Sequence, residues 1–363
     1  MGKVSVSAVT LMGNKHRQRG VPCEDASKAV TDNGVSVVCI ADGAGGKNYT
    51  HARYGAECVV NTITKLLTEH FDAIYNENRE AAVKSLILAS LHVGFADLMS
   101  EHKLDSIERL SCTMLFCAVK DRRVLVGHIG DGLICKVTPS AVVPITMPQN
   151  GEDSSHTYFV TANHAADYLR LIKMTTDDCH AICLMTDGVQ DSVYNENSGL
   201  IKPVMVKLAN TLAAGREEAE KSLNNVISEF IVGSSNNSDD ASFGVLYFED
   251  TQSVAADKLP NECDEFPRSD DSFKKLQELL LPDVKRARQI IVDAASNAPV
   301  EVPTNREAIA NSAGASKQAS EVDNKLDSNN FRYVNKYTMI ALYSIIVILL
   351  VLLICLFVTF KRS

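Results

Sequence analysis

The sequence predicts an α+β fold in which antiparallel sheets are covered by helices. Segments with strand-like alternation follow one another in hairpin-linked groups, whereas segments with helical periodicity come in pairs. This order differs from a regular alternation of strand and helix, which is typical of parallel sheets. With 363 residues and a hydrophobic fraction of 45%, the chain can bury one large core or two ordinary cores.

The first half of the chain contains the clearest elements. Residues 3–12 alternate like a half-buried strand, and a polar loop over Asn14–Pro22 follows. Gly34–Ala41 is a short apolar run, and we expect it to form a second, buried strand. Two amphipathic helices are predicted next, over residues 51–70 and 79–101, because apolar residues recur there at helical spacing.

A meander of three strands is predicted over Cys112–Val119, Arg123–Ile129 and Leu133–Thr138. We expect both breaks between them to be hairpins, and the second break is Gly130-Asp131-Gly132. The remaining predicted elements are a strand over 181–186, helices over 200–213 and 216–231, and a strand over 242–248.

The composition changes at about Thr251, so we expect a domain over residues 1–250 to end there. Within the following segment, 251–296, the sequence predicts two short helices broken at Pro282. This segment could dock onto a partner or a membrane, or it could pack back onto the domain. Its apolar side consists of Phe273, Leu276, Leu279 and Leu280. Residues 297–336 are rich in Ala, Asn and Ser and predict a flexible linker.

The C-terminal region predicts a single transmembrane helix over residues 337–360. Thr338–Phe360 is a stretch of 23 residues without a charge, flanked by Lys336 and Lys361. A helix of that length spans the hydrocarbon layer of about 30 Å, so we expect this anchor to contact membrane lipid. The N-terminus lacks the apolar core of a signal peptide, and we therefore expect the domain to face the cytoplasm.

Charge and cysteine content exclude two classes of function. The net charge is −9, which argues against nucleic acid as a partner because binding to phosphate backbones requires a basic surface. The ten cysteines are mostly single and lie within apolar runs, without a spacing that suits zinc. We interpret them as buried thiols of a reducing compartment.

Five acidic positions share one pattern, since each lies at the end of a predicted strand or in a turn. They are Asp25, Asp42, Asp131, Asp187 and Asp239. Taken singly, an Asp-Gly pair is most often a turn, but five such positions without a neighbouring His or Cys predict a hard-oxygen site for Mg²⁺ or Mn²⁺. The glycines after Asp42 do not match a Walker A loop or a dinucleotide-binding pattern.

The order of these motifs resembles the type 2C metal-dependent serine/threonine protein phosphatases, and their bacterial branch most closely. The resemblance covers about residues 3–249. It rests on C-E-D-A (23–26), A-D-G-A-G-G (41–46), S-C-T-M (111–114), G-D-G (130–132), M-T-D-G-V-Q-D (185–191) and D-D-A-S (239–242). It implies a β-sandwich of two antiparallel sheets flanked by pairs of helices, in four layers.

The resemblance also implies a binuclear Mg²⁺ or Mn²⁺ centre. Asp42 would bridge both ions, and the Gly43 carbonyl would ligate one of them. Asp187 and Asp239 would hold one ion, while Asp25 would act on the other through coordinated water.

Two further acidic residues receive roles from the same resemblance. Glu24 would orient the coordinated water, and Asp131 would form a third, weaker metal site together with Asp187. The implied catalytic residues are therefore Asp42, Asp25 and Glu24. The implied reaction is attack of a metal-activated hydroxide on phosphoserine or phosphothreonine.

The sequence departs from the family pattern in two places. Ala44 stands where many members have a histidine that is proposed as a general acid. Gly20 stands where the phosphate-binding arginine is expected, so His16, Arg17 or Arg19 could replace it, or could simply belong to a solvated basic loop.

The leading hypothesis is thus a membrane-tethered phosphoprotein phosphatase, with phosphorylated proteins of a membrane-associated serine/threonine kinase system as partners. The alternative is a catalytically weak pseudophosphatase that acts as a scaffold or sensor at the membrane. A third hypothesis is activity on a small phosphorylated metabolite, because no motif identifies the substrate.

Overall fold

The computed structural model describes residues 4–139, 141–149, 157–195, 198–202, 204–210, 216–235, 238–249 and 271–297. These residues belong to one compact unit, Met1–Pro299. The predicted anchor over 337–360 lies outside the described residues, as does the predicted linker beyond Asn297.

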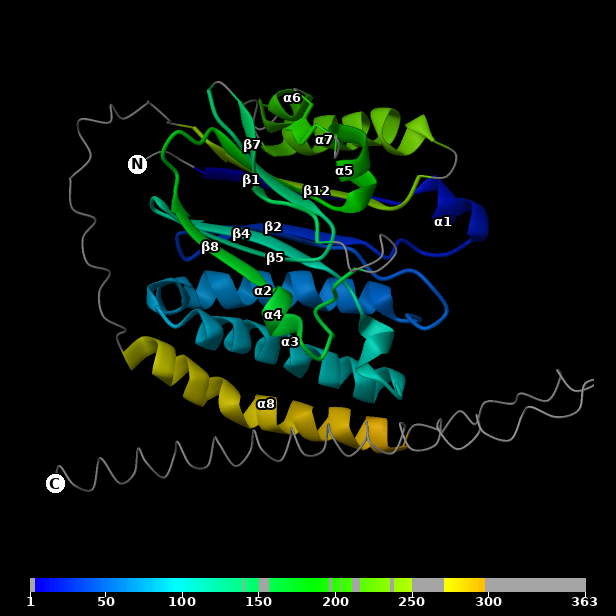
Figure 1. The fold of residues 1–363 in the computed structure, drawn as a ribbon, viewed down its shortest axis with the longest axis vertical. Helices are drawn as coiled ribbons and strands as arrows, with labels where there is room; N and C mark the ends of the chain where they lie inside the picture. Colours follow the sequence, from blue (N-terminus) through cyan, green and yellow to red (C-terminus); the bar gives the residue numbers. More distant parts are fainter. Residues whose placement is uncertain are drawn as a thin grey trace, which may run out of the picture. The chain divides into compact units, whose positions relative to one another are not determined.

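Two five-stranded antiparallel sheets form the centre of the unit, which confirms the predicted α+β class (Figure 1). The first sheet has the order β2 (Ala26–Asp32), β3 (Val35–Ala41), β4 (Met114–Lys120), β5 (Arg123–Ile129) and β8 (Arg170–Thr175). The second has the order β1 (Val4–Leu11), β12 (Ala241–Phe248), β9 (Ala181–Met185), β6 (Leu133–Val137) and β7 (Val142–Thr146). A separate two-stranded sheet pairs β10 (Tyr194–Asn195) with β11 (Leu200–Ile201).

Helices cover the outer face of each large sheet, which gives four layers (Figure 1). The helices α2 (Ala52–Asn76) and α3 (Glu80–His102) lie over the first sheet. The helices α6 (Val204–Asn210) and α7 (Arg216–Phe230) lie over the second. Shorter helical segments are α1 (Asn14–Arg19), η1 (Ile107–Leu110), α4 (Ala165–Tyr168), α5 (Asp187–Val193) and η3 (Val232–Ser234).

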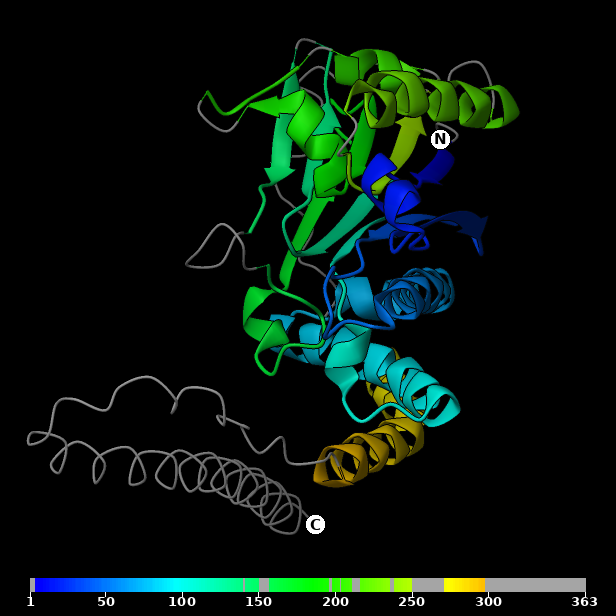
Figure 2. The same cartoon turned by 90° about the vertical axis from the view of Figure 1, so that its right-hand side faces the viewer.

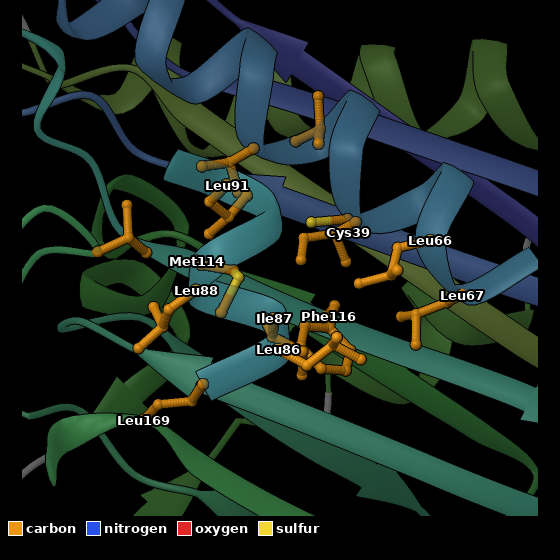
Figure 3. Packing of buried hydrophobic residues seen from close by; sticks show 14 of the residues in the cluster. Cys39, Leu66, Leu67, Leu86, Ile87, Leu88, Leu91, Met114, Phe116 and Leu169 are labelled. Atoms are coloured by element: carbon orange, nitrogen blue, oxygen red, sulfur yellow. The ribbon is translucent and has the colours of Figure 1, made fainter. Parts of the chain in front are cut away.

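The position of β3 inside the sandwich explains why its sequence is a continuous apolar run. Cys39 packs into the core between the first sheet and its helices, where Figure 3 shows it near Leu66 and Phe116. Val38 and Ile40 point the other way, into the core between the two sheets. A strand in the middle of a sandwich is buried on both faces, so it cannot alternate between apolar and polar residues.

Several boundaries differ from the predictions. The predicted loop over Asn14–Pro22 contains the one-and-a-half-turn helix α1. The edge strand β2 was not predicted, because Lys28 and the hydroxyl side chains around it give no apolar pattern and pairing with β3 alone holds it in the sheet. The predicted helix over 200–213 begins only at Val204, after the short strand β11.

The prediction that Gly130-Asp131-Gly132 joins two hairpin strands is wrong. The strand β5 belongs to the first sheet and β6 to the second, so this tripeptide carries the chain from one sheet to the other. Gly130 has a φ of 124°, which an L side chain rarely adopts. A Gly-Asp-Gly sequence suits a hairpin and a sheet crossing equally well, so the pattern could not separate them.

The segment after the domain forms one helix, α8 (Asp271–Asn297), rather than two helices broken at Pro282. The helix packs against α3, on the side that faces away from the sheets (Figure 2). Pro282 is exposed, so the carbonyl that it leaves without a donor can bond to water. Phe273 and Leu276 are buried in this contact, in agreement with the alternative that the segment packs back onto the domain, but Leu279 is 65% exposed.

We expect Phe273→Ala to lower the free energy of unfolding by about 3–5 kcal/mol, because the ring is 1% exposed and its removal leaves a cavity. Leu279→Ala is the matched control on the same helix and should change stability by less than about 0.5 kcal/mol. Urea unfolding of the two variants measures the difference. Equal stabilities would show that α8 is not docked on α3 in solution.

Within the described ranges, α3 is the one helix that is long and apolar enough to cross a membrane. Half of its most apolar stretch is buried. The helix packs between α2 and α8, and this packing accounts for its apolar composition.

Candidate metal centre

Asp42 follows the last residue of β3, and the segment Ser111–Thr113 holds its backbone in place. The Asp42 amide donates to Thr113 Oγ1 at 2.9 Å, and the Thr113 amide donates to the Asp42 carbonyl at 2.8 Å. Gly43 then forms an isolated antiparallel bridge with Cys112. A Cβ atom on Gly43 would lie 2.5 Å from the Glu24 carbonyl oxygen, so only glycine fits between Asp42 and the Glu24 segment.

Asp25 immediately precedes β2 and is 6% exposed. Its Oδ2 accepts a hydrogen bond from Thr186 Oγ1 at 2.9 Å. The same hydroxyl oxygen accepts from the Ser242 amide at 2.9 Å. Because Thr186 directly follows β9 and Ser242 lies in β12, this chain of hydrogen bonds joins Asp25 to the second sheet.

Asp187 and Asp131 flank two paired strands of the second sheet, since Asp187 follows β9, Asp131 precedes β6, and Met185 lies opposite Leu133 in the antiparallel pair. Asp187 is the first residue of α5, directly after β9 and Thr186. Asp131 lies in the crossing between β5 and β6, and Thr157 Oγ1 donates to its Oδ2. Both side chains are half-buried, so a ligand that arrives from solvent can reach them.

The Asp239-Asp240 pair precedes β12, and its two side chains have different environments. Asp239 is half-buried and forms an ion pair with Lys15 at 2.7 Å. Asp240 is 3% exposed and accepts from the Gly13 and Glu24 amides, each at 2.7 Å. Asp240 therefore fixes the start of α1 and the Glu24 segment beside Asp239.

His16 is the predicted phosphate-binding residue that lies beside the acidic positions. Its Nδ1 donates to Asp240 Oδ2 at 2.7 Å, because a carboxylate can only accept. Its Nε2 lies 3.7 Å from Glu24 Oε2 and 3.9 Å from Asp239 Oδ1. Arg17 and Arg19 are exposed on the same helix, and Arg17 donates to Asn14 rather than to an acidic residue of the site.

Mutual repulsion shows that four of the predicted carboxylates lie near one another. Burial and the charges of Asp187 and Asp240 raise the pKa of Asp25 well above its usual value. Burial and the charges of Asp25, Asp187 and Asp131 raise the pKa of Asp42 in the same way. The pKa of Asp187 rises to about 6 through burial and the charge of Asp131.

Asp239 and Glu24 complete the acidic site, and their pKa values are shifted in opposite directions. The pKa of Asp239 is lowered, since hydrogen bonding and the charge of Lys15 outweigh its burial. The pKa of Glu24 is raised, mainly by burial. The negative charge of Asp239 also raises the pKa of Asp187. The six predicted acidic residues thus form one electrostatically connected group.

No three His, Cys, Asp or Glu side chains in the described part of the chain are arranged as a finished cage for a metal ion. The chemistry of the group nevertheless fits hard divalent cations. Its side chains offer only carboxylate oxygens, and the largest influences on the pKa values of Asp25, Asp42 and Asp187 are burial, neighbouring carboxylates and hydrogen bonds rather than a positively charged side chain. Carboxylates that repel one another without a counter-charge favour binding of Mg²⁺ or Mn²⁺.

Three residues of the site were not predicted from the sequence. Asp240, Thr113 and Thr186 belong to the quoted motifs, but the sequence assigns none of them a role. A pair of adjacent acids before a strand is a signal for one exposed and one buried side chain, because successive residues point in opposite directions. The hydrogen bonds made by the hydroxyl groups of Thr113 and Thr186 join segments that are distant in the sequence, so no local pattern indicates them.

Comparison with known proteins gives one family and several similar structures. A family model described as "Protein phosphatase 2C" matches residues 12–228, more than half of the chain. A bacterial serine phosphatase has a TM-score of 0.50 and 14% identity over 69% of this chain and 100% of that chain. The serine/threonine phosphatase Stp1 from Staphylococcus aureus has a TM-score of 0.50 and 15% identity over 68% of this chain and 96% of that chain. None of the curated proteins matches the sequence.

Proposed function

The chain belongs to the protein phosphatase 2C family, and from this membership we propose that it is a metal-dependent phosphoprotein phosphatase that hydrolyses phosphoserine and phosphothreonine. The observation that carries the proposal is the group of buried and half-buried, mutually repelling carboxylates at the strand ends. A protein that only bound a partner would have no need to hold Asp25, Asp42 and Asp187 so close together at the cost of their repulsion.

We assign the metal ligands as the sequence predicts them. Asp42 would bridge two ions, Gly43 would contribute its carbonyl, and Asp187, Asp239 and Asp25 would complete the binuclear centre. Asp131 would hold a third ion with Asp187. When bound, Mg²⁺ or Mn²⁺ would lower the pKa of water and offset the charge on the phosphoryl oxygens.

The residues of the chain position this centre and receive the substrate. Glu24 lies next to Asp25, and Asp240 fixes its backbone, so Glu24 is suited to orient water. Because Nδ1 of His16 donates to Asp240, Nε2, which lies beside Glu24 and Asp239, can donate to a phosphoryl oxygen only when the ring carries both protons. Arg17 and Arg19 on the same exposed helix add positive charge for an approaching phosphopeptide.

We expect His16→Gln to raise KM for a phosphothreonine peptide by about tenfold, because it removes one hydrogen bond to a charged oxygen. The matched control is Arg19→Gln on the same helix, whose effect should be smaller and should disappear at high salt. Initial rates at several peptide concentrations measure both. A fall in kcat with KM unchanged would contradict a role of His16 in substrate binding.

The test of the function is phosphate release from a phosphothreonine peptide with Mn²⁺, with Mg²⁺ and with excess chelator. We expect turnover with either ion and none in chelator. Turnover that persists in chelator would overturn the metal-dependent mechanism. p-Nitrophenyl phosphate and a set of small phosphorylated metabolites, assayed beside the peptide, distinguish a phosphoprotein phosphatase from an enzyme of metabolism.

The scaffold hypothesis rests on a specific residue, Ala44. Its side chain is 5% exposed and cannot donate a proton, and its amide donates to the Ser111 carbonyl at 3.0 Å. A leaving alkoxide then depends on solvent or another group for its proton. In calorimetry, the absence of Mn²⁺ binding would favour the scaffold, because a scaffold without turnover has no requirement for the ion.

We also propose that Thr338–Phe360 anchors the enzyme in a membrane, with the domain on the cytoplasmic side. Its 23 uncharged residues support this assignment. A tether raises the local concentration of the enzyme near membrane-bound substrates, and phosphorylated proteins of a membrane-associated kinase system fit such a position. Full-length protein should stay with membranes after an alkaline wash, whereas a chain that ends at Lys336 should be released with unchanged activity on a soluble peptide.

A further inference from the structure

The segment Ser111–Thr113 is the one motif of the sequence to which the proposed function assigns no role. Each of its residues contacts a different part of the acidic site. The Ser111 carbonyl accepts from the Ala44 amide at 3.0 Å, and Cys112 forms the bridge with Gly43. Thr113 makes the two hydrogen bonds to the backbone of Asp42 that were described above.

The same segment also contacts the part of the chain that carries Asp131. A Cβ atom built on Gly130 would lie 2.5 Å from Thr113 Cγ2, so the Gly130 backbone is in direct contact with that methyl group. The Cys112 carbonyl accepts from the Val160 amide at 3.0 Å, and Ser111 Oγ is hydrogen-bonded to Thr161 Oγ1 at 2.6 Å.

Thr113 therefore presents two different groups to two different ligand positions. Its hydroxyl oxygen binds the amide of Asp42, at the end of β3. Its methyl group packs on Gly130, the residue before Asp131. The side chain is 2% exposed, so neither contact can be replaced by bulk water.

We propose that Thr113 is a positioning residue that sets the distance between Asp42 and Asp131. The inference rests on the proposed function, because it assigns Thr113 a role toward the metal ligands of that function. Threonine suits the role, since the hydroxyl fixes one ligand segment and the methyl limits the approach of the other. Serine and valine each keep only one of these two groups.

The pair Thr113→Val and Thr113→Ser separates the two contacts. Thr113→Val keeps a methyl on Gly130 but leaves the Asp42 amide without an acceptor. We expect it to lower kcat by about 10- to 100-fold with KM changed by less than about threefold, as for other residues that orient a metal ligand. Thr113→Ser keeps the acceptor and should retain kcat within about threefold.

Two measurements without turnover report the positions of the ligands. In chelator, the amide of Asp42 should exchange with deuterium at least about tenfold faster in Thr113→Val, relative to the Ile40 amide, and at the wild-type rate in Thr113→Ser. In calorimetry with Mn²⁺, Thr113→Ser should weaken the weakest site, because Gly130 and Asp131 lose the methyl that supports them. Thr64→Val is the control, since Thr64 is equally buried but its hydroxyl donates only to helix carbonyls.

The possible outcomes decide the proposal. Loss of kcat with faster Asp42 exchange in Thr113→Val, together with a weaker Mn²⁺ site in Thr113→Ser, would support it. Equal behaviour of the two variants, or an equal loss in Thr64→Val, would show a general effect on stability and would overturn it. If the wild-type protein releases no phosphate, the proposed function fails, while the exchange and calorimetric measurements still test Thr113.

Discussion

Asp42→Asn is expected to lower phosphate release from a phosphothreonine peptide by about a thousandfold or more, which corresponds to at least about 4 kcal/mol in the activation barrier. Asp42 interacts with Asp25, Asp131 and Asp187, so its carboxylate lies among three of the other predicted metal ligands. The substitution removes one negative charge and one metal-binding oxygen from the centre of that group. Its backbone contacts to Thr113 do not involve the carboxylate and should persist.

Asp32→Asn is the matched control, because Asp32 is exposed at the end of β2 farthest from the site. Its rate should stay within about twofold of the wild type. Circular dichroism on both variants checks that the fold is retained. If the activity of Asp42→Asn stays within tenfold of the wild type, Asp42 is not an essential metal ligand and the prediction is wrong.

The second large effect is on stability in the absence of metal. We expect the free energy of unfolding in chelator to fall as the pH rises from about 4 to about 6. The pKa of Asp187 is about 6 in the folded chain and about 4 in the unfolded chain, so in this range the folded chain binds the proton more tightly. The contribution of Asp187 alone is about 3 kcal/mol, and the raised pKa values of Asp25 and Asp42 act in the same direction.

Saturating Mn²⁺ at pH 7 should reverse this loss, because an ion that binds only the folded chain adds about 3–4 kcal/mol at 100 to 1,000 times its dissociation constant. Asp42→Asn should flatten the pH dependence in chelator, since it removes one of the repelling charges. Groups with a lowered pKa, such as Glu77 at about 2, stabilise the fold throughout most of this range and lose that stabilisation only as the pH falls below it. A stability in chelator that rises from pH 5 to pH 7 would contradict the repulsion that we describe.

The sequence predicted the parts of the fold that depend on local pattern. The apolar run that ends at Ala41 is a strand, and the two helices after it are α2 and α3. Hydrophobic periodicity decides such elements, because each buries a continuous stripe or face. The edge strand β2 and the short helix α1 have no such stripe, and contacts with other segments hold them in place.

The predicted acidic residues lie in one region, but their roles could not be separated from the sequence. Asp239 and Asp240 are adjacent and chemically identical, yet one faces Lys15 and the other is buried among three donors. The crossing at Gly130-Asp131-Gly132 depends on which sheet β6 joins. That choice is made by its pairing with β9, about 48 residues later in the chain, which no local signal reveals.

The pairing of β1 with β12 has a consequence for folding during synthesis on the ribosome. Val4 lies opposite Phe248, so the second sheet cannot close until nearly 250 residues have been synthesised. All strands of the first sheet, by contrast, are complete once Thr175 has emerged. At about 5–20 residues per second, the nascent chain spends roughly 4–15 s with one finished sheet and one open sheet. During that time Asp239 is not yet in place, so the acidic site is incomplete, and the unpaired edges of β1 and β9 are where a chaperone would bind.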